Sequence, residues 1–145
     1  VMHLIERDDF PGFDLLLDKG MKLDFVVRGT SPIHEICLKK DKVWLERLLK
    51  AGASPNFVNH GWHRRTVCSP IDCISFRTEF NASTEGDIEL IEILANAGAN
   101  LNEYLPTRET PLVHASLMAR FDVVWKLLVA GANFRERVST APDFI

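Results

Sequence analysis

Hydrophobic and polar residues alternate along this chain with the period of short amphipathic helices. Leu45, Leu48 and Leu49 stand at positions i, i+3 and i+4, and Val124, Leu127 and Leu128 repeat this spacing. The spacing predicts one apolar stripe on each helix, which must be buried against a neighbour. Small residues and a glycine follow each such run. These glycines are Gly20, Gly52, Gly98 and Gly131. Because glycine readily adopts the left-handed conformation that ends a helix, the pattern predicts four helix ends.

Helix starts are marked by a hydroxyl residue followed by proline. The three pairs are Ser31-Pro32, Ser69-Pro70 and Thr110-Pro111. The hydroxyl group can cap the helix, and proline suits its first position because no backbone N–H is needed there. Each unit is therefore predicted to contain a helix, a short turn, a second helix, a glycine stop and an extended loop.

The spacing of these marks divides the chain into repeats. Successive glycines are separated by 32, 46 and 33 residues. The middle interval is longer because the third unit carries an eight-residue insertion between its helices and a preceding loop that is five or six residues longer than the others. The insertions include residues 60–65 and 76–83.

The order of these marks resembles the ankyrin repeat, whose unit is a β-turn followed by two antiparallel helices. Ser31-Pro32-Ile33-His34 is similar to its first signature, and Gly131-Ala132-Asn133 is similar to its second. Asp72 and Val113 stand where the family usually has histidine. The resemblance implies an all-α solenoid of stacked helix-turn-helix units joined by β-hairpin-like loops, with no enzymatic activity.

The expected organisation is a single domain over residues 1–145. Its repeats cover about 1–24, 25–57, 58–103 with the insertions, 104–137 and a partial unit at 138–145. Apolar residues stand at both ends, Val1-Met2 and Phe144-Ile145. Because terminal repeats of a solenoid usually present a polar outer face, we expect either that the array continues beyond both ends or that these termini pack against the end repeats.

Composition narrows the class of partner. The 145 residues are 46% hydrophobic and 26% charged, and 17 basic against 20 acidic residues give a net charge of −3. This balance argues against a general nucleic-acid or anionic-membrane binder. Because the sequence shows no long uncharged apolar window and no basic start followed by an apolar run, we expect neither a membrane span nor a secretory leader. Three cysteines are too few and odd in number for a disulfide framework. We therefore expect a cytoplasmic protein, with the nucleus or a host cell as alternatives.

Catalytic and cofactor motifs are missing from the sequence: there is no phosphate-binding loop, zinc-protease motif or nucleophile elbow. We expect no enzyme, no cofactor and no small-molecule substrate. His34 is expected to hydrogen-bond the neighbouring hairpin, and His114 to lie on a helix face. His60, His63, Cys68 and Cys73 have no standard zinc spacing, and we interpret Cys73 as a small buried residue. The charged runs at 39–42 and 85–92 are expected to be solvated outer surface.

The resemblance implies that binding occurs on the concave side, formed by hairpin tips and first helices. The residues predicted to contact a partner are Arg28, Lys39, Trp62, Arg64, Arg65, Phe76, Arg77, Leu117 and Met118. Arg28, Lys39, Arg65 and Arg77 would form a basic stripe suited to an acidic or apolar partner segment. Trp62 is the largest predicted anchor, unless it folds back over its own loop.

We therefore interpret the chain as a protein–protein interaction module, acting as an inhibitor or adaptor. The alternative is a regulatory or substrate-recruiting ankyrin segment of a larger enzyme or effector. Replacing Trp62 by alanine and Arg65 by glutamate is expected to weaken binding while leaving the helical circular dichroism unchanged.

Overall fold

A computed structural model describes residues 1–59, 69–75, 85–103 and 109–134 of the chain. These residues contain eight helices, which follow one another in four pairs. The pairs are α1 (Met2–Glu6) with α2 (Phe10–Asp18), α3 (Pro32–Lys39) with α4 (Lys42–Lys50), α5 (Pro70–Ser75) with α6 (Asp87–Asn96), and α7 (Pro111–Leu117) with α8 (Phe121–Val129).

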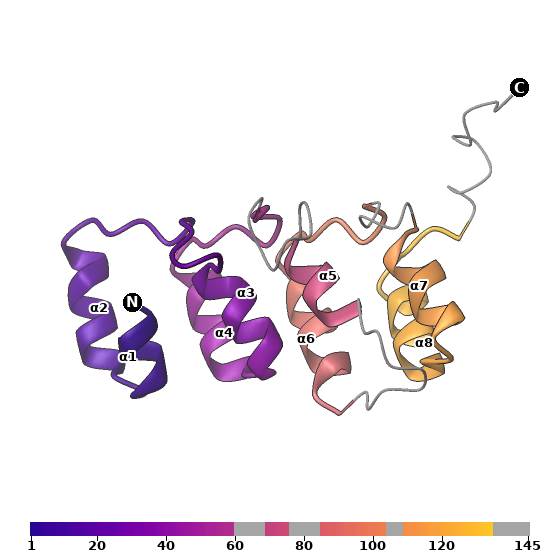
Figure 1. The fold of residues 1–145 in the computed structure, drawn as a ribbon, viewed down its shortest axis with the longest axis horizontal. Helices are drawn as coiled ribbons and strands as arrows, with labels where there is room; N and C mark the ends of the chain where they lie inside the picture. The colour runs from indigo at the N-terminus through magenta and orange to yellow at the C-terminus, as the bar shows by residue number, and fades with distance from the viewer. Residues whose placement is uncertain (60–68, 76–84, 104–108, 135–145) are drawn as a thin grey trace, which may run out of the picture.

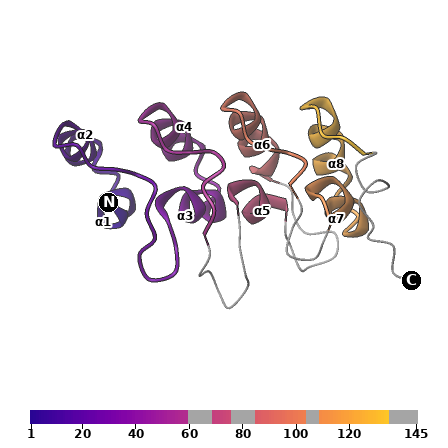
Figure 2. The ribbon, with the colours of Figure 1, turned by 90° about the horizontal axis from the view of Figure 1, so that it is seen from above.

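The four pairs stand side by side in an elongated array (Figure 1). Seen from above, α1, α3, α5 and α7 form one layer, and α2, α4, α6 and α8 form a second (Figure 2). The loop between α2 and α3 projects beyond the first layer. Among the described residues the only β pairing is one bridge between Val27 and Thr30, so the architecture is an all-α solenoid, as predicted.

Local signals place the helix ends where the sequence predicts them. Pro32, Pro70 and Pro111 are each the first residue of a helix. The side chains of Ser31 and Thr110 accept hydrogen bonds from backbone N–H groups three residues further on, which caps two of these helices. All four repeat glycines are left-handed, with φ between +82° and +102°. A side chain at these positions would be strained, so glycine is needed there.

The hydrophobic core runs along the array between the two layers. Leu45 and Leu48 of α4 are fully buried, in agreement with the predicted stripe, and Leu49 is half-buried against the same core. In α8 the prediction is partly wrong, because Val123 and Leu127 are buried, whereas Val124 is half-buried and Leu128 is 39% exposed. The stripe of α4 is covered by the next helix pair, and no described helix covers the corresponding side of α8.

A ladder of side-chain hydrogen bonds joins successive loops. In each step the acceptor is a side-chain oxygen of the residue four positions after one repeat glycine. The donor is the backbone N–H of the residue two positions after the next repeat glycine. The three steps are Asp24 to Ser54 at 3.0 Å, Asn56 to Asn100 at 2.7 Å and Asn102 to Asn133 at 2.7 Å. The ladder sets the spacing of the helix pairs at the loop edge.

Candidate functional site

The hairpin between α2 and α3 is the best-defined part of the predicted binding surface. Val27 and Thr30 exchange backbone hydrogen bonds of 2.8 and 3.1 Å across Arg28 and Gly29. Arg28 and Gly29 both have positive φ, +52° and +80°, as a two-residue type I′ turn requires. A hairpin tip is therefore present at Arg28, as the resemblance implied.

The tip of this hairpin is exposed, and a residue of the following unit supports it. Val26 and Val27 are 44% and 45% exposed, and Arg28 is also exposed. The buried side chain of Asn59 donates a hydrogen bond of 2.9 Å to the carbonyl of Gly29. Because Asn59 follows the second helix pair, the next unit of the array holds the tip in place.

Three other predicted contact residues lie at the opposite end of the first-layer helices. Lys39 is the last residue of α3, Leu117 is the last residue of α7, and Met118 is its C-cap. Leu117 is 56% exposed, whereas Met118 is half-buried. Arg28 precedes α3, so it is separated from Lys39 by the helix length of about 12 Å. The structure therefore does not bring Arg28 and Lys39 together.

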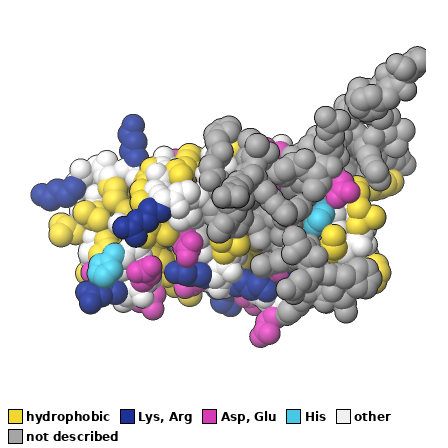
Figure 3. Space-filling view, in the orientation of Figure 1, with side chains coloured by type: hydrophobic (Ala, Val, Ile, Leu, Met, Phe, Trp, Pro, Cys, Tyr) yellow, Lys and Arg dark blue, Asp and Glu magenta, His cyan; other side chains and the backbone are white. Residues whose placement is uncertain are grey.

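The predicted basic stripe is interrupted by acidic neighbours. The ammonium group of Lys39 lies 3.3 Å from a carboxylate oxygen of Glu35, one turn earlier. On the face shown in Figure 3, basic and acidic side chains are mixed over the N-terminal half of the array. Trp62, Arg64, Arg65, Phe76 and Arg77 lie outside the described residues, as do both insertions and the partial unit at 138–145. For these five residues binding stays a prediction.

The charged runs at 39–42 and 85–92 are not simply solvated, which corrects the sequence interpretation. Asp87, the first residue of α6, is completely buried and forms an ion pair with the equally buried Arg120. Lys40 approaches Asp87 to 3.5 Å and donates a 2.9 Å hydrogen bond to the carbonyl of Glu85. These groups therefore connect helix pairs inside the array.

Sequence reasoning missed Arg120 altogether. It lies in the turn between α7 and α8 and donates hydrogen bonds to the carbonyls of Ile74 and Ser75, at 2.9 and 3.2 Å. The only signal in the sequence is an arginine just before an apolar helix. Such a residue is usually interpreted as exposed, because arginine is rarely buried without a partner.

The histidines of the first-layer helices are buried. The Nδ1 atom of His34 lies 2.6 Å from the hydroxyl oxygen of Ser31, the residue that caps its helix. His114, expected on a helix face, is only 4% exposed and lies 3.2 Å from a carboxylate oxygen of Glu109. Both rings have polar partners within their own repeat, so their geometry supports a structural role.

Asp72 occupies the position that His34 has in its repeat. Its carboxylate is 3% exposed and accepts a 2.8 Å hydrogen bond from the backbone N–H of Ser69. This bond is one of the two hydrogen bonds of a capping box at the start of α5. Burial raises the pKa of Asp72 to about 6; hydrogen bonds from Ser69 oppose this shift and the charge of Glu103 adds to it.

Within the described part of the chain, no group of three or more His, Cys, Asp or Glu side chains could hold a metal ion. Cys73 is buried, as predicted. His60, His63 and Cys68, the other residues considered for zinc, lie outside the described ranges. Among the described helices, none has the length and apolarity needed to span a bilayer.

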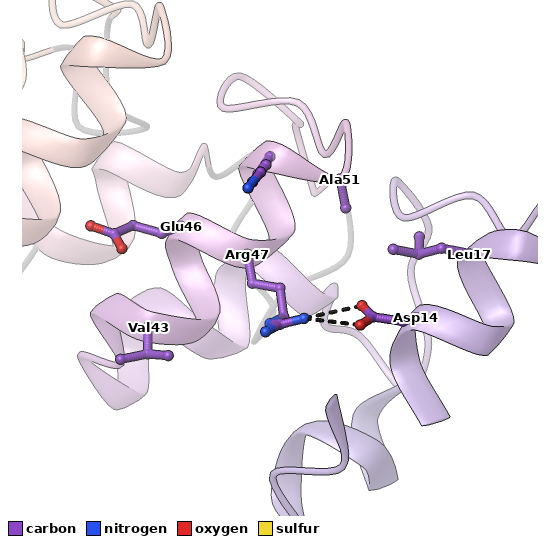
Figure 4. Close-up of a pocket in the computed structure, with 7 residues that line it drawn as sticks. Asp14, Leu17, Val43, Glu46, Arg47 and Ala51 are labelled. Atoms are coloured by element: carbon purple, nitrogen blue, oxygen red, sulfur yellow. Dashed lines mark hydrogen bonds and ion pairs between the residues drawn. The ribbon is translucent and has the colours of Figure 1, made fainter. Parts of the chain in front are cut away.

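A groove of about 530 Å³ separates α2 from α4 in the second layer. Asp14 and Leu17 form one wall, and Val43, Arg47 and Lys50 lie on the other. Figure 4 shows Arg47 reaching across to Asp14, with nitrogen–oxygen distances of 3.0 and 3.3 Å. An open groove with an ion pair across it offers no sheltered site for chemistry.

Trp44 packs between the first two helix pairs. The repeat position eight residues before the closing glycine is Trp44 in α4, Leu90 in α6 and Val123 in α8. The indole of Trp44 is fully buried against Phe10 and Phe13, with ring-centroid distances of 4.8 and 5.2 Å. Its N–H donates to Asp8 at 2.7 Å. This side chain therefore joins α4 to the first helix pair through both packing and a hydrogen bond.

Comparisons with known proteins support the fold. No protein-family model matches the sequence, and no curated protein matches it. An ankyrin repeat domain from Acinetobacter baumannii AYE aligns with 83% of this chain at 24% identity and a TM-score of 0.66, and the chain spans 58% of that domain. The ankyrin repeat domain of human ASB11 is 24% identical over 90% of this chain and 68% of its own, with a TM-score of 0.43.

The likeness to the bacterial domain and the four helix pairs show that this chain has the ankyrin-repeat fold. The fold expected from the sequence is thereby confirmed. The three steps of the loop ladder join the four pairs, and the hairpin lies between the first two.

Proposed function

We propose that this chain is a protein-binding module that presents a preformed surface to another protein, as an inhibitor or an adaptor. The ankyrin-repeat fold supports an interaction role in general. The observation that carries the proposal is the hairpin at 26–30, where two exposed valines and an exposed arginine are fixed in a tight turn.

The rigidity of this hairpin favours binding. Two backbone hydrogen bonds close it, and the amide of Asn59 holds Gly29 from the following unit. A surface that is already ordered loses little conformational entropy when a partner binds. When a partner covers the exposed side chains of Val26 and Val27, their removal from water lowers the free energy of the complex. The tip is therefore suited to a stable contact.

The chemistry of the tip suggests the partner. Arg28 offers a guanidinium group that can donate two parallel hydrogen bonds to one carboxylate. Val26 and Val27 provide apolar contact beside it. We propose a partner segment in which an acidic residue adjoins apolar ones. On a chain with a net charge of −3, this local positive charge would orient such a segment rather than attract nucleic acid.

The test compares proteins captured by immobilised variants of this chain from a lysate of its source cells. The hairpin variant combines Val26→Asp with Arg28→Asn. Asparagine before glycine is a favoured type I′ sequence, so the turn is preserved while its charge is removed. The matched control combines Val43→Asp with Lys50→Asn on α4, where both side chains are exposed.

If the proposal is right, at least one captured protein is retained in equal amounts by the wild-type chain and the α4 control. The hairpin variant should retain about tenfold less of that protein. Equal retention by all three chains would place the contact elsewhere. The predicted contacts outside the described residues are tested in the same assay with Trp62→Ala combined with Arg65→Glu.

A further inference from the structure

Exposed apolar side chains concentrate at the last described helix pair. Ten large hydrophobic residues are exposed in the part of the chain that the structure covers, and six of them lie between residues 117 and 134. Phe121 and Trp125 of α8, and Phe134 in the loop after it, are 70%, 71% and 65% exposed. In Figure 3 hydrophobic side chains are visible at this end of the array. Apolar surface gathered in this way marks a site of contact.

In earlier repeats the equivalent loop and first-layer positions are covered. Phe134 lies three residues after its repeat glycine, where Leu23 and Leu101 are only 6% and 7% exposed. Leu117, the last residue of α7, is 56% exposed. The last-but-one residue of α3, Leu38, stands at the same distance from its repeat glycine and is half-buried against the core. These positions therefore belong to the core wherever another pair follows.

The second-layer helix α8 shows the same difference. Val124 is half-buried, whereas Phe13, Leu45 and Ile91, each seven residues before its own repeat glycine, are fully buried. Leu128 is 39% exposed. Its equivalents in the three earlier helices all pack against the core, and they are Leu17, Leu49 and Ala95. The α7–α8 pair thus has the apolar residues of an internal unit, without the cover that internal units have.

In earlier repeats this side of the helix contacts the next helix pair. Phe121 lies ten residues before its repeat glycine, like Phe10 and Lys42. Phe10 stacks on Trp44 of the second pair, with ring centroids 4.8 Å apart. Lys42 pairs with Glu89 of the third pair at 3.1 Å. The exposed side of α8 is therefore a stacking side, and no described helix stands against it (Figures 1 and 2).

The exposed face extends over both layers and the loop edge. Leu117 belongs to the first layer, Phe121 and Trp125 to the second, and Phe134 to the loop that follows. A single partner helix would cover only one of these parts. A helix pair with its loop, which is how each earlier unit meets its neighbour, reaches all of them at once. A polar end unit, in contrast, would need no cover.

We propose that a fifth helix pair of the same array, contributed by the chain after residue 134, covers this face. The sequence predicts its start at 138–145, where Pro142 follows Gly131 by 11 residues; Pro32 and Pro111 follow their repeat glycines by 12 and 13. The fold is not limited to the length of this chain, which spans 58% of the bacterial ankyrin repeat domain. The proposal goes beyond the proposed function, because the hairpin at 26–30 lies elsewhere.

This junction would depend on apolar packing more than the earlier ones do. The position that accepts the ladder hydrogen bond, four residues after the repeat glycine, is Arg135, and arginine has no acceptor. Trp125 stands where Asp14 and Glu92 form ion pairs with the next helix pair. Large apolar side chains therefore replace both kinds of polar link at this junction.

The source gene beyond codon 145 gives the first test. The proposal predicts a second amphipathic helix and then a glycine 32 or 33 residues after Gly131, the intervals that separate Gly20 from Gly52 and Gly98 from Gly131. A stop codon before that point, or a polar segment without this pattern, would overturn the proposal.

The second test uses the chain extended through the fifth pair. Phe121→Asp combined with Phe134→Asp would bury two carboxylates at the junction, so amide exchange in the fifth pair should accelerate at least about tenfold. In the 145-residue chain both positions are exposed, and exchange in α7 and α8 should change less than about twofold.

The matched control combines Val43→Asp with Val129→Asp, which are 54% and 64% exposed. Val129 lies where Asp18, Lys50 and Asn96 stay exposed in earlier units, so this control should leave exchange in the fifth pair unchanged.

Sedimentation equilibrium of the extended chain separates a second copy from the fifth pair as the cover. The proposal predicts the same oligomeric state for the extended chain and for its Phe121→Asp, Phe134→Asp variant. A dimer that this variant dissociates would show that another copy covers the face, and would overturn the proposal. Unchanged exchange in the fifth pair of the variant would also overturn it. Neither result affects the capture of a partner by the hairpin.

Discussion

The guanidinium group of Arg120 contacts the carboxylate of Asp87, and both side chains are completely shielded from solvent. Asp87 begins α6, and Arg120 lies between α7 and α8. Because Arg120 also donates to the carbonyls of Ile74 and Ser75 at the end of α5, one side chain connects the third and fourth helix pairs. Buried charges of this kind are stable only when their partners are present.

Replacing Arg120 by methionine should destabilise the array strongly. The change leaves the buried carboxylate of Asp87 without its closest cation, and breaking such a pair typically costs about 3–5 kcal/mol. Denaturant unfolding at neutral pH, followed by circular dichroism, measures this loss. Lys126→Met is the control, because the pair of Lys126 with the exposed Glu92 is worth about 0–1 kcal/mol.

The double variant Asp87→Leu with Arg120→Met refines this test. Because it removes both charges, its loss of unfolding free energy should be smaller than the sum of the losses measured for Asp87→Leu alone and Arg120→Met alone. A loss for Arg120→Met no larger than that for Lys126→Met would mean that the buried pair does not hold these helix pairs together.

Replacing Asp72 by asparagine should stabilise the protein at neutral pH. Burial raises the pKa of Asp72 to about 6 from 3.8, so the folded state holds a proton that the unfolded state has already lost. The stability of the wild type therefore falls as pH rises from about 4 to about 6, and the penalty stays constant above that range. The asparagine variant lacks this penalty, which amounts to about 3 kcal/mol at most.

Urea unfolding of both chains at several pH values measures this effect. The advantage of Asp72→Asn should be small near pH 4, grow up to about pH 6 and then remain level. Other titrating groups are common to both chains and cancel in the difference. A difference that does not change with pH would show that Asp72 ionises as easily in the folded state as in the unfolded chain.

Replacing Trp44 by alanine should loosen the first helix pair selectively. Trp44 fills the junction between α2 and α4, and removing a buried tryptophan costs about 3–5 kcal/mol. In a solenoid each repeat contacts only its neighbours. Amide hydrogen exchange should therefore accelerate most in α1 and α2 and least in α7 and α8.

Trp125→Ala is the matched control, because Trp125 is 71% exposed. It should change the stability of the chain by no more than about 0.5 kcal/mol. Uniformly faster exchange along the whole array of the Trp44 variant would contradict a local role for this side chain.

Helix positions could be predicted from the sequence because their signals are local. Proline after a hydroxyl residue, and glycine after an apolar run, act within one turn of backbone, so Pro32, Pro111 and Gly52 needed no knowledge of neighbours. The hairpin tip at Arg28 was expected from the resemblance to the ankyrin repeat, and Gly29, with its positive φ, suits the turn that the structure shows.

The buried pair could not be predicted because its two members are 33 residues apart. An acidic residue at the start of a charged run has the pattern of a solvated helix end, and only packing of the next pair buries it. The error at Val124 and Leu128 has a similar origin. Their exposure depends on which helix lies beyond α8, and amphipathic spacing alone does not contain that information.

The bond between Asp24 and Ser54 has a mechanical consequence for the first helix pair. It joins the loop edge of this pair to the next one, while α2 and α4 are separated by the groove on the opposite layer. Trp44 and Arg47 join the same two pairs on the helix side, through Asp8 and Asp14. The first junction is therefore held at both of its edges. The hairpin at 26–30 begins two residues after Asp24, so a partner bound there would contact a segment anchored to a junction that is tied on both sides.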